Sequence, residues 1–204
     1  MNWLAHVFLS EQKIDFQIGN FLADPLKGKL WDSASADMQK GVDIHKIIDS
    51  YTDSHKIVSI SKARLREKGL LKPVIVDLTY DYFLTKNWNM FSSIPIKEFL
   101  ESFNKEAKKR SNDLPTQASE LVANLADEDR LNKYHDLDQL KKAFERIDTR
   151  LSKKLLLRES AVGYFDIVNE KINDLESDFL IFFPDLCIFL KKDLNQNNLN
   201  HWRI

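Results

Sequence analysis

Three side chains that can bind a divalent ion recur at every fourth position within residues 41–55. On a helix, His45, Asp49 and Asp53 form one stripe that drifts only modestly around the axis. Isoleucines between them provide an apolar contact, which predicts a helix packed on a core with its carboxylates at the core's edge. Carboxylates four residues apart repel each other, and a partly buried charge is costly without a partner. A divalent cation would remove both costs.

Two further candidate ligands precede this stripe. His6 lies within a short apolar helix predicted over residues 2–10, and Asp24 precedes Pro25, which is expected to end any helix there. Each residue has a plainer interpretation. His6 would then be a core histidine that donates to a carbonyl oxygen, and Asp24 would form only a local turn. The metal interpretation requires that ligands from other segments reach them.

A second acidic pair, Asp77 and Asp81, lies at i,i+4 within an apolar helix predicted over residues 74–88. On a bare helix these carboxylates repel each other. Ion pairs with Arg or Lys from neighbouring helices would also satisfy them. Two acidic pairs in one small chain, together with the histidines and Asp24, nevertheless favour a shared cation.

Histidine and carboxylate ligands without a thiolate suit Mn²⁺, Mg²⁺, Fe²⁺ or Zn²⁺ acting on an oxygen-rich substrate. Such an ion activates water and neutralises charge on a phosphoryl oxygen, so phosphoester hydrolysis is the natural reaction. The chain has no phosphate-binding glycine loop, no Gly-x-Ser-x-Gly elbow and no His-Glu-x-x-His helix. The one His-Asp dipeptide, His135–Asp136, precedes a predicted helix, so Asp136 is interpreted as its N-cap.

The elements that position these residues are predicted to be helices throughout. Five Gly and five Pro in 204 residues, with apolar residues at helical spacing, favour an all-α, single-domain helical bundle. We expect the domain to cover residues 1–194 and a frayed tail to cover residues 195–204, although Trp202 could dock. Ser33 or Ser35 is expected to cap the helix that runs through residues 41–55. Further helices are predicted at residues 56–68, 95–110, 116–126, 136–151 and 158–183.

The charge balance and the single cysteine indicate where the protein is located and which classes of partner are excluded. Thirty Lys and Arg against thirty-one Asp and Glu leave no overall field that would attract nucleic acid or a membrane. The longest apolar run near the C-terminus, residues 179–183, ends at Pro184 and is too short to span a bilayer. The N-terminus lacks the basic residues with which a signal peptide begins. Cys187 stands alone, which excludes an internal disulfide. We expect a soluble, cytoplasmic protein, and the sequence does not determine its oligomeric state.

Four motifs, in their order and spacing, resemble the acyl carrier protein phosphodiesterase family. They are Met1-Asn-Trp-Leu-Ala-His6, Gly19-Asn-Phe-Leu-Ala-Asp24, Gly41-x3-His45-x3-Asp49-x3-Asp53 and Asp77-x3-Asp81-Tyr-Phe-Leu84. The resemblance implies a mainly helical, rearranged relative of the HD phosphohydrolases with a role in fatty acid biosynthesis. It also implies Mn²⁺-dependent hydrolysis of the phosphodiester that joins 4'-phosphopantetheine to a serine of holo-acyl carrier protein. At position 82, directly after Asp81, the family motif is expected to have a histidine, and this chain has Tyr82. The difference concerns the side chain at position 82 and leaves the role implied for Asp81 unchanged.

The resemblance also implies roles for individual residues. The best ligand candidates are His6, Asp24, His45, Asp49 and Asp81. Asp53 and Asp77 would complete the ligand shell or orient the histidines. Asn20 would contact phosphate or hold the turn at Asp24, and the candidate catalytic residues are Asn20, Asp24, His45 and Asp49. We hypothesise that an ion-activated water attacks phosphorus in line and that the serine oxygen leaves, protonated by an acidic group or by a metal-bound water.

Because an acyl carrier protein is small and acidic, a basic surface is expected beside the metal. The first candidate surface comprises Lys62, Arg64, Arg66 and Lys68, and the second comprises Arg146, Arg150, Lys153, Lys154 and Arg158. Two other interpretations stay open. One is an HD-like phosphohydrolase acting on a nucleotide or another small phosphoester. The other is a non-catalytic helical binding protein whose acidic stripes pair with Arg and Lys.

Overall fold

The computed structural model describes residues 1–204 and contains twelve α-helices, three short 3₁₀ helices and no β-strand. The all-α prediction is therefore confirmed. None of the helices combines the length and the hydropathy that a membrane-spanning segment requires. The α-helices are α1 (Trp3–Phe8), α2 (Ile14–Leu22), α3 (Ala36–Ser54), α4 (Lys56–Leu65), α5 (Lys72–Lys86), α6 (Trp88–Phe91), α7 (Ile96–Ser111), α8 (Thr116–Asp127), α9 (Leu137–Asp148), α10 (Lys153–Leu156), α11 (Phe165–Glu170) and α12 (Ile172–Leu190). The 3₁₀ helices are η1 (Arg130–Asn132), η2 (Val162–Tyr164) and η3 (Gln196–Asn198).

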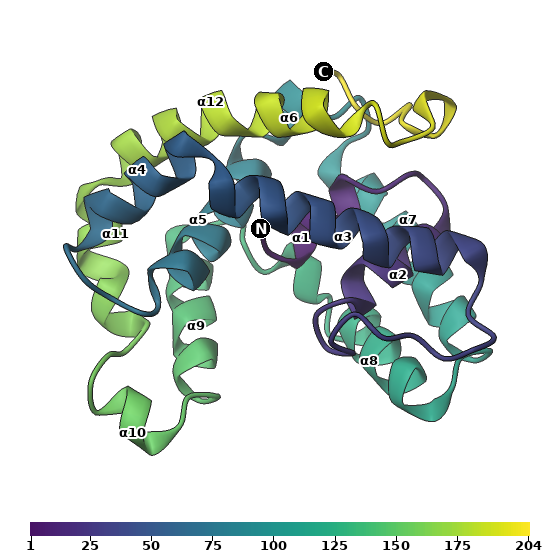
Figure 1. Ribbon diagram of the computed structural model, residues 1–204, viewed down its shortest axis with the longest axis horizontal. Coiled ribbons are helices and arrows are strands. Elements are labelled where there is room, and N and C mark those ends of the chain that lie inside the picture. Colours follow the sequence, from purple (N-terminus) through teal and green to yellow (C-terminus); the bar gives the residue numbers. More distant parts are fainter.

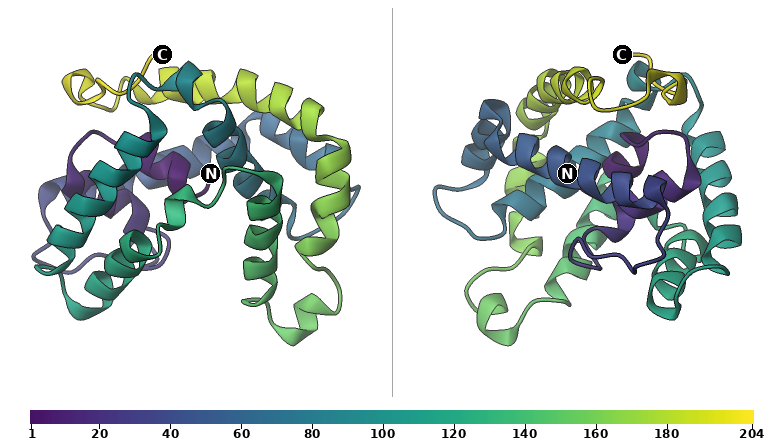
Figure 2. Two further views of the ribbon diagram at one scale, coloured as in Figure 1. Left: turned by 180° about the vertical axis from the view of Figure 1, so that it is seen from behind. Right: turned by 45° about the vertical axis from the view of Figure 1, so that its right-hand side comes forward.

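α12 runs along the top of the molecule next to α4, α3 crosses the middle in front of α1 and α2, and two groups of helices extend downwards (Figures 1 and 2). One group contains α2, α7 and α8, and the other contains α5, α9, α10 and α11. α1 lies between the two groups and contacts α2 and α5. A single core of 51 buried residues runs through both groups, so the chain is one domain. The segments that carry the candidate ligands meet near its centre.

Local signals set the start of several helices. Ser35 Oγ accepts a hydrogen bond from the Met38 amide at 3.2 Å, so Ser35 rather than Ser33 caps α3. Pro73 lies in the first turn of α5, where its missing N–H costs no hydrogen bond. The Asp136 carboxylate accepts from the Gln139 amide at 2.7 Å, which confirms the predicted N-cap of α9.

Two predicted helices differ from those observed. The helix expected over residues 56–68 ends at Leu65, because Arg66 is already extended. The helix expected over residues 158–183 is replaced by a turn, η2, α11 and α12. α12 continues through Pro184, which was predicted to break the apolar run. A proline removes one backbone hydrogen bond, and the apolar residues buried on both sides of Pro184 keep the helix packed.

The segment at 195–204, predicted to fray, packs on the core instead. His201 Nε2 and Trp202 Nε1 both donate to the Phe8 carbonyl oxygen, at 2.7 and 3.0 Å, and both rings are buried. The Glu11 carboxylate accepts from the Asn195 amide and from Asn198 Nδ2. The prediction that Trp202 docks is therefore confirmed, and these polar contacts explain why the tail is ordered.

α2 and α3 approach each other closely at two glycines. A Cβ atom on Gly19 would lie 2.1 Å from the Met38 carbonyl oxygen, and one on Gly41 would lie 2.2 Å from the Phe16 carbonyl oxygen. Both obstacles are backbone atoms, which cannot rotate away as a side chain can. This contact brings Asn20 of α2 beside His45 of α3.

We expect Gly41→Ala to lower the free energy of unfolding by at least about 2 kcal/mol, because the added methyl must push α2 and α3 apart. Urea denaturation measures the change. Gly163→Ala is the matched control, since the nearest atom to its added Cβ would lie 3.6 Å away. We expect the control to shift the free energy by no more than about 0.5 kcal/mol. Equal stability of the two variants would contradict the close contact.

Candidate metal centre

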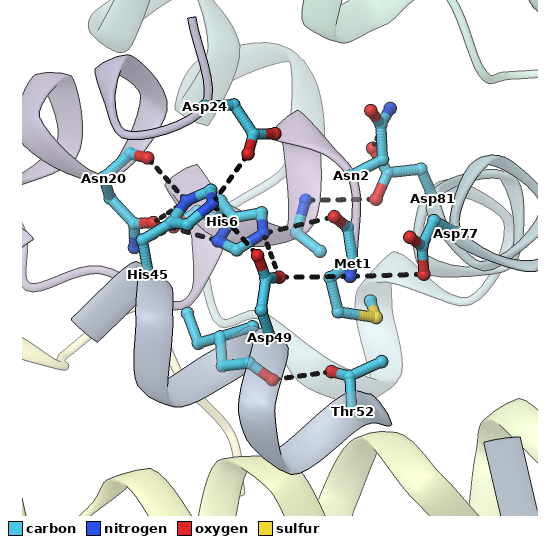
Figure 3. Close-up of polar contacts among 12 residues, drawn as sticks. Met1, Asn2, His6, Asn20, Asp24, His45, Asp49, Thr52, Asp77 and Asp81 are labelled. Atoms are coloured by element: carbon cyan, nitrogen blue, oxygen red, sulfur yellow. Dashed lines mark hydrogen bonds and ion pairs between the residues drawn. The ribbon is translucent and has the colours of Figure 1, made fainter. Parts of the chain in front are cut away.

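Two histidines and an aspartate from α1 and α3 converge near the centre of the molecule (Figure 3). Asp49 Oδ1 lies 3.3 Å from His6 Nε2, and Asp49 Oδ2 lies 3.2 Å from His45 Nε2. The two imidazole rings are stacked, with centroids 3.9 Å apart. One potential ligand atom from each of the three residues lies within 4.8 Å of the other two. The i,i+4 spacing on α3 aligns His45 with Asp49, and α1 brings His6 to them.

Asn20 fixes the tautomer of both histidines. Its Nδ2 donates to the His6 carbonyl oxygen at 3.0 Å and to Ser10 Oγ at 2.9 Å, so its Oδ1 faces the rings. That oxygen lies 2.9 Å from His6 Nδ1 and 3.1 Å from His45 Nδ1. The main-chain oxygen of Asn20 also lies 2.8 Å from His45 Nδ1. Because these oxygens only accept, each Nδ1 carries a proton, and each Nε2 is directed to Asp49.

The surroundings of His6 fit a cation. Burial lowers the pKa of His6, so its ring is neutral and its Nε2 holds a lone pair. The nearest polar atoms are the Met1 carbonyl oxygen at 3.1 Å and Asp49 Oδ1 at 3.3 Å. Both are acceptors, so this lone pair has no donor in the protein. Imidazole nitrogen and carboxylate oxygen together suit Mn²⁺, Fe²⁺ and Zn²⁺, and a bound ion would satisfy the lone pair.

His45 is protonated on both ring nitrogens at neutral pH. Burial disfavours its charged form, but hydrogen bonds to Asp24 and Asp49 outweigh burial and raise the pKa of His45 to about 9. Burial likewise acts against the charge on Asp49, yet the hydrogen bond that it accepts from His45 holds the pKa of that carboxyl far below its usual range. Ion binding at Nε2 of His45 must therefore displace a proton.

Asp24 lies at the edge of this cluster, on the turn that follows α2. Its Oδ1 is 3.1 Å from His45 Nε2, and this hydrogen bond lowers the pKa of Asp24. The side chain is 58% exposed, and its second oxygen has no hydrogen-bond donor in the protein. The structure thus places Asp24 beside His45, at the side of the cluster that solvent reaches.

Asp77 borders the cluster without touching either histidine. Its Oδ1 lies 3.2 Å from the Met1 nitrogen, which is also 3.6 Å from Asp49 Oδ1 (Figure 3). Burial disfavours the charge on the Met1 ammonium, but the two carboxylates outweigh it and raise its pKa. Nothing in the sequence pattern indicated that the Met1 nitrogen would link Asp77 to Asp49.

Asp81, expected to be a ligand, does not face the histidines. Its carboxylate accepts from the amides of Leu4 and Ala5, at 2.9 and 3.2 Å, and from Asn2 Nδ2 at 3.0 Å. These amides belong to the first turn of α1, so Asp81 satisfies the N-terminus of the helix that carries His6. Burial raises the pKa of Asp81 to about 7, against the effect of these hydrogen bonds. Its observed contribution is to hold α1 in place.

Asp53 also lies away from the cluster. Its side chain is 73% exposed and pairs with Lys62 Nζ at 3.0 Å. The structure therefore does not support a role for Asp53 in completing the ligand shell or in orienting a histidine. Of the seven candidate ligand and supporting residues, the cluster contains four, namely His6, Asp24, His45 and Asp49.

The first candidate docking surface is largely used by internal contacts. Arg64 donates two hydrogen bonds to the buried carboxylate of Asp178, at 2.8 and 3.2 Å. The Arg66 guanidinium lies 4.0 Å from the centre of the Tyr164 ring and donates to the Gly163 carbonyl oxygen. Lys62 pairs with Asp53, and of the four only Lys68 is without a protein partner. These contacts join Lys62 and Arg64 of α4 to α3 and α12, and they join Arg66 to η2, so three of the four residues are engaged within the protein.

Comparisons with known proteins identify relatives over nearly the whole chain. The family model described as acyl carrier protein phosphodiesterase matches residues 1–186. A protein of that name from Shigella boydii serotype 18 is 29% identical over 188 residues, which cover 90% of this chain and 94% of the relative. Another of the same name, from Enterobacter sp. (strain 638), is 27% identical over 193 residues, which cover 94% and 98%. No solved structure matches.

Proposed function

Because the chain belongs to the acyl carrier protein phosphodiesterase family and is therefore a hydrolase of phosphodiesters, we propose a specific substrate for it. The bond cleaved is the phosphodiester that joins 4'-phosphopantetheine to a serine of holo-acyl carrier protein, and the products are the apo-protein and 4'-phosphopantetheine. The observation that carries this proposal is the convergence of His6, His45 and Asp49, with both rings held by Asn20, in a chain of this family.

The proposed cofactor is a divalent ion, with Mn²⁺ first and Mg²⁺, Fe²⁺ and Zn²⁺ as alternatives. His6, His45 and Asp49 would hold it, with Asp24 beside them. When bound, the ion would lower the pKa of a water molecule and neutralise charge on a phosphoryl oxygen. An unpaired imidazole lone pair and a set of nitrogen and oxygen donors support this assignment.

The chain's own groups have separate roles in the proposed reaction. Asn20 keeps a proton on Nδ1 of each ring, which leaves each Nε2 available as a ligand. The oxygen of Asp24 that lacks a protein donor is placed to accept a proton from the attacking water. Asp81 caps α1 and so positions His6, and Asp77 positions Met1 beside Asp49.

Intact mass spectrometry of holo-acyl carrier protein tests the reaction directly. Incubation with the enzyme and Mn²⁺ is expected to remove the mass of 4'-phosphopantetheine from the carrier protein, and enzyme treated with a chelator is expected not to. An unchanged carrier protein after incubation with the metal-loaded enzyme would overturn the proposed substrate. Turnover of a small model phosphodiester as fast as that of holo-acyl carrier protein would instead favour a small-molecule phosphohydrolase.

The binding-protein interpretation is not supported by the contacts at the centre. In that interpretation Arg and Lys side chains neutralise the carboxylates. Asp24 pairs only with His45, and the groups that contact Asp49 are two histidines and the Met1 nitrogen. No Arg or Lys side chain lies within 4.0 Å of either carboxylate.

The affinity for Mn²⁺ is expected to rise about tenfold per pH unit between pH 7 and pH 9 and then to level off. Below its pKa of about 9, His45 is protonated and must lose that proton when it becomes a ligand. Because one proton is released for each ion bound, each unit of pH below 9 weakens the apparent affinity by a factor of about ten. Isothermal titration calorimetry in buffers of different ionisation enthalpy measures both the affinity and the proton released. A dissociation constant that does not change with pH would contradict this protonation state.

A further inference from the structure

Two adjacent cavities share part of their lining, and the larger of them reaches Asp24, which lies beside the candidate metal centre. The first cavity, about 400 Å³, is bordered at one end by Asp24 and Asp77. The second, about 120 Å³, lies between α9 and the segment around η1. Both are lined by the same five residues, Asn2, Trp3, Leu78, Ile147 and Arg150. The two cavities together are called the groove below, and it extends from Asp24 along α9.

Three cations that line this groove have no partner in the protein. The side chains of Lys133, Arg146 and Arg150 form no ion pair within 4.0 Å and donate no hydrogen bond. Lys133 and Arg146 are half-buried, so their unpaired charge is more costly than that of a fully solvated side chain. By contrast, Arg64 and Arg110, which are also half-buried, each hold an aspartate bidentately. The groove therefore presents positive charge that an external anion can satisfy.

The number of cations indicates where that anion comes from. A phosphodiester carries one negative charge, and in the proposed reaction that charge lies at the metal centre, beside Asp24. The pantetheine arm consists of amide, hydroxyl, methyl and thiol groups and is uncharged at neutral pH. Three unpaired cations thus exceed what the prosthetic group can neutralise, which leaves carboxylates of the carrier protein itself as the matching anions.

We propose that the groove between α1, α5 and α9 is the docking surface for an acidic segment of the carrier protein, whose carboxylates pair with Lys133, Arg146 and Arg150. This inference rests on the proposed function. Trp3, Leu78 and Ile147 provide an apolar wall between these cations and the metal centre, against which the linkage to the prosthetic group packs. The surface is part of the site that the substrate enters, and Arg64 of α4, which pairs with Asp178, is not involved.

Charge reversal tests the docking surface. The Arg146→Glu/Arg150→Glu variant is expected to bind fluorescently labelled apo-acyl carrier protein at least about tenfold more weakly than the wild type, and to lose most of the salt dependence of binding. The KM for holo-acyl carrier protein should rise by a similar factor, while the bound Mn²⁺ per chain stays at the wild-type value. The matched control is Lys105→Glu/Lys109→Glu on α7, which makes the same change in net charge at exposed positions away from the groove. The control should bind within about twofold of the wild type.

The arms of this experiment separate failure of docking from failure of the reaction. Equal affinity of the groove variant and the wild type for apo-acyl carrier protein would overturn the docking surface, and so would the lack of any binding by the wild type. An equal loss of kcat/KM on a small phosphodiester and on holo-acyl carrier protein would also overturn it, because the cations would then act on the reacting phosphate. Failure of the wild type to release 4'-phosphopantetheine, with binding intact and sensitive to the groove substitutions, would instead remove only the proposed reaction.

Discussion

Asp49→Ala is expected to lose the bound divalent ion and to slow release of 4'-phosphopantetheine by at least about a thousandfold. Asp49 is the one residue whose oxygens face both imidazole Nε2 atoms, at 3.3 and 3.2 Å. Loss of a residue that merely supports a metal ligand costs about 10- to 100-fold, so loss of a ligand between two others should cost more. Elemental analysis of the purified variant measures the ion, and intact mass spectrometry of the carrier protein measures the reaction.

Asp53→Ala is the matched control for this substitution. It removes the same side chain from the same helix, but from a position where the carboxylate is exposed and pairs with Lys62. An exposed pair of this kind contributes about 0 to 1 kcal/mol to stability, so the control should keep its ion and its rate. Normal metal content and normal turnover in Asp49→Ala would show that the ligand assignment is wrong.

Asn20→Leu is expected to weaken Mn²⁺ binding by about 10- to 100-fold, because it removes the side-chain acceptor of His6 Nδ1 and one of the two acceptors of His45 Nδ1. The Asn20 side chain also donates to Ser10 and to the main chain of α1, so part of any loss of activity could be structural. A readout specific to the tautomer is therefore required. Nitrogen NMR of ¹⁵N-labelled histidine distinguishes Nδ1–H from Nε2–H, and His6 should shift toward the Nε2–H form in the variant.

Asn20→Asp provides the control, because it keeps an acceptor oxygen beside both Nδ1 atoms while losing the Nδ2 donor. If Asn20 acts through the tautomer, Asn20→Asp should retain the Nδ1–H form of His6 and recover much of the Mn²⁺ affinity lost in Asn20→Leu. Identical tautomers in the wild type and in Asn20→Leu would contradict this positioning role. Equal losses of affinity in both variants would indicate that Asn20 acts only through its donor bonds.

The helical positions of the centre could be predicted because they depend on local spacing. His45 and Asp49 are one turn apart, and the structure places them on the same face of α3. Extending the same stripe to Asp53 failed for a geometric reason. At about 100° per residue, each step of four residues turns about 40° around the axis, so Asp53 lies about 80° from His45. That rotation carries its carboxylate out of the cluster to Lys62.

The partners of buried charges could not be predicted, because they come from distant parts of the chain. Asp81 and Asp77 look equivalent on α5, yet Asp81 accepts from the amides of α1, more than seventy residues away. Arg64 was expected on the first candidate docking surface, but its partner Asp178 is 114 residues away on α12. The acyl carrier protein phosphodiesterase family was recognisable from short motifs, whereas the role of each charge within them depends on tertiary contacts.

The hydrogen bonds from His201 and Trp202 to the Phe8 carbonyl have a consequence for how the enzyme matures. These donors lie 193 and 194 residues beyond the helix that carries His6. At a synthesis rate of about 5 to 20 residues per second, the ribosome adds them roughly 10 to 40 s after that helix. The end of α1 therefore stays unsecured on the nascent chain, and a tightly held ion is expected only after residues 201 and 202 have been made and the chain has closed on itself.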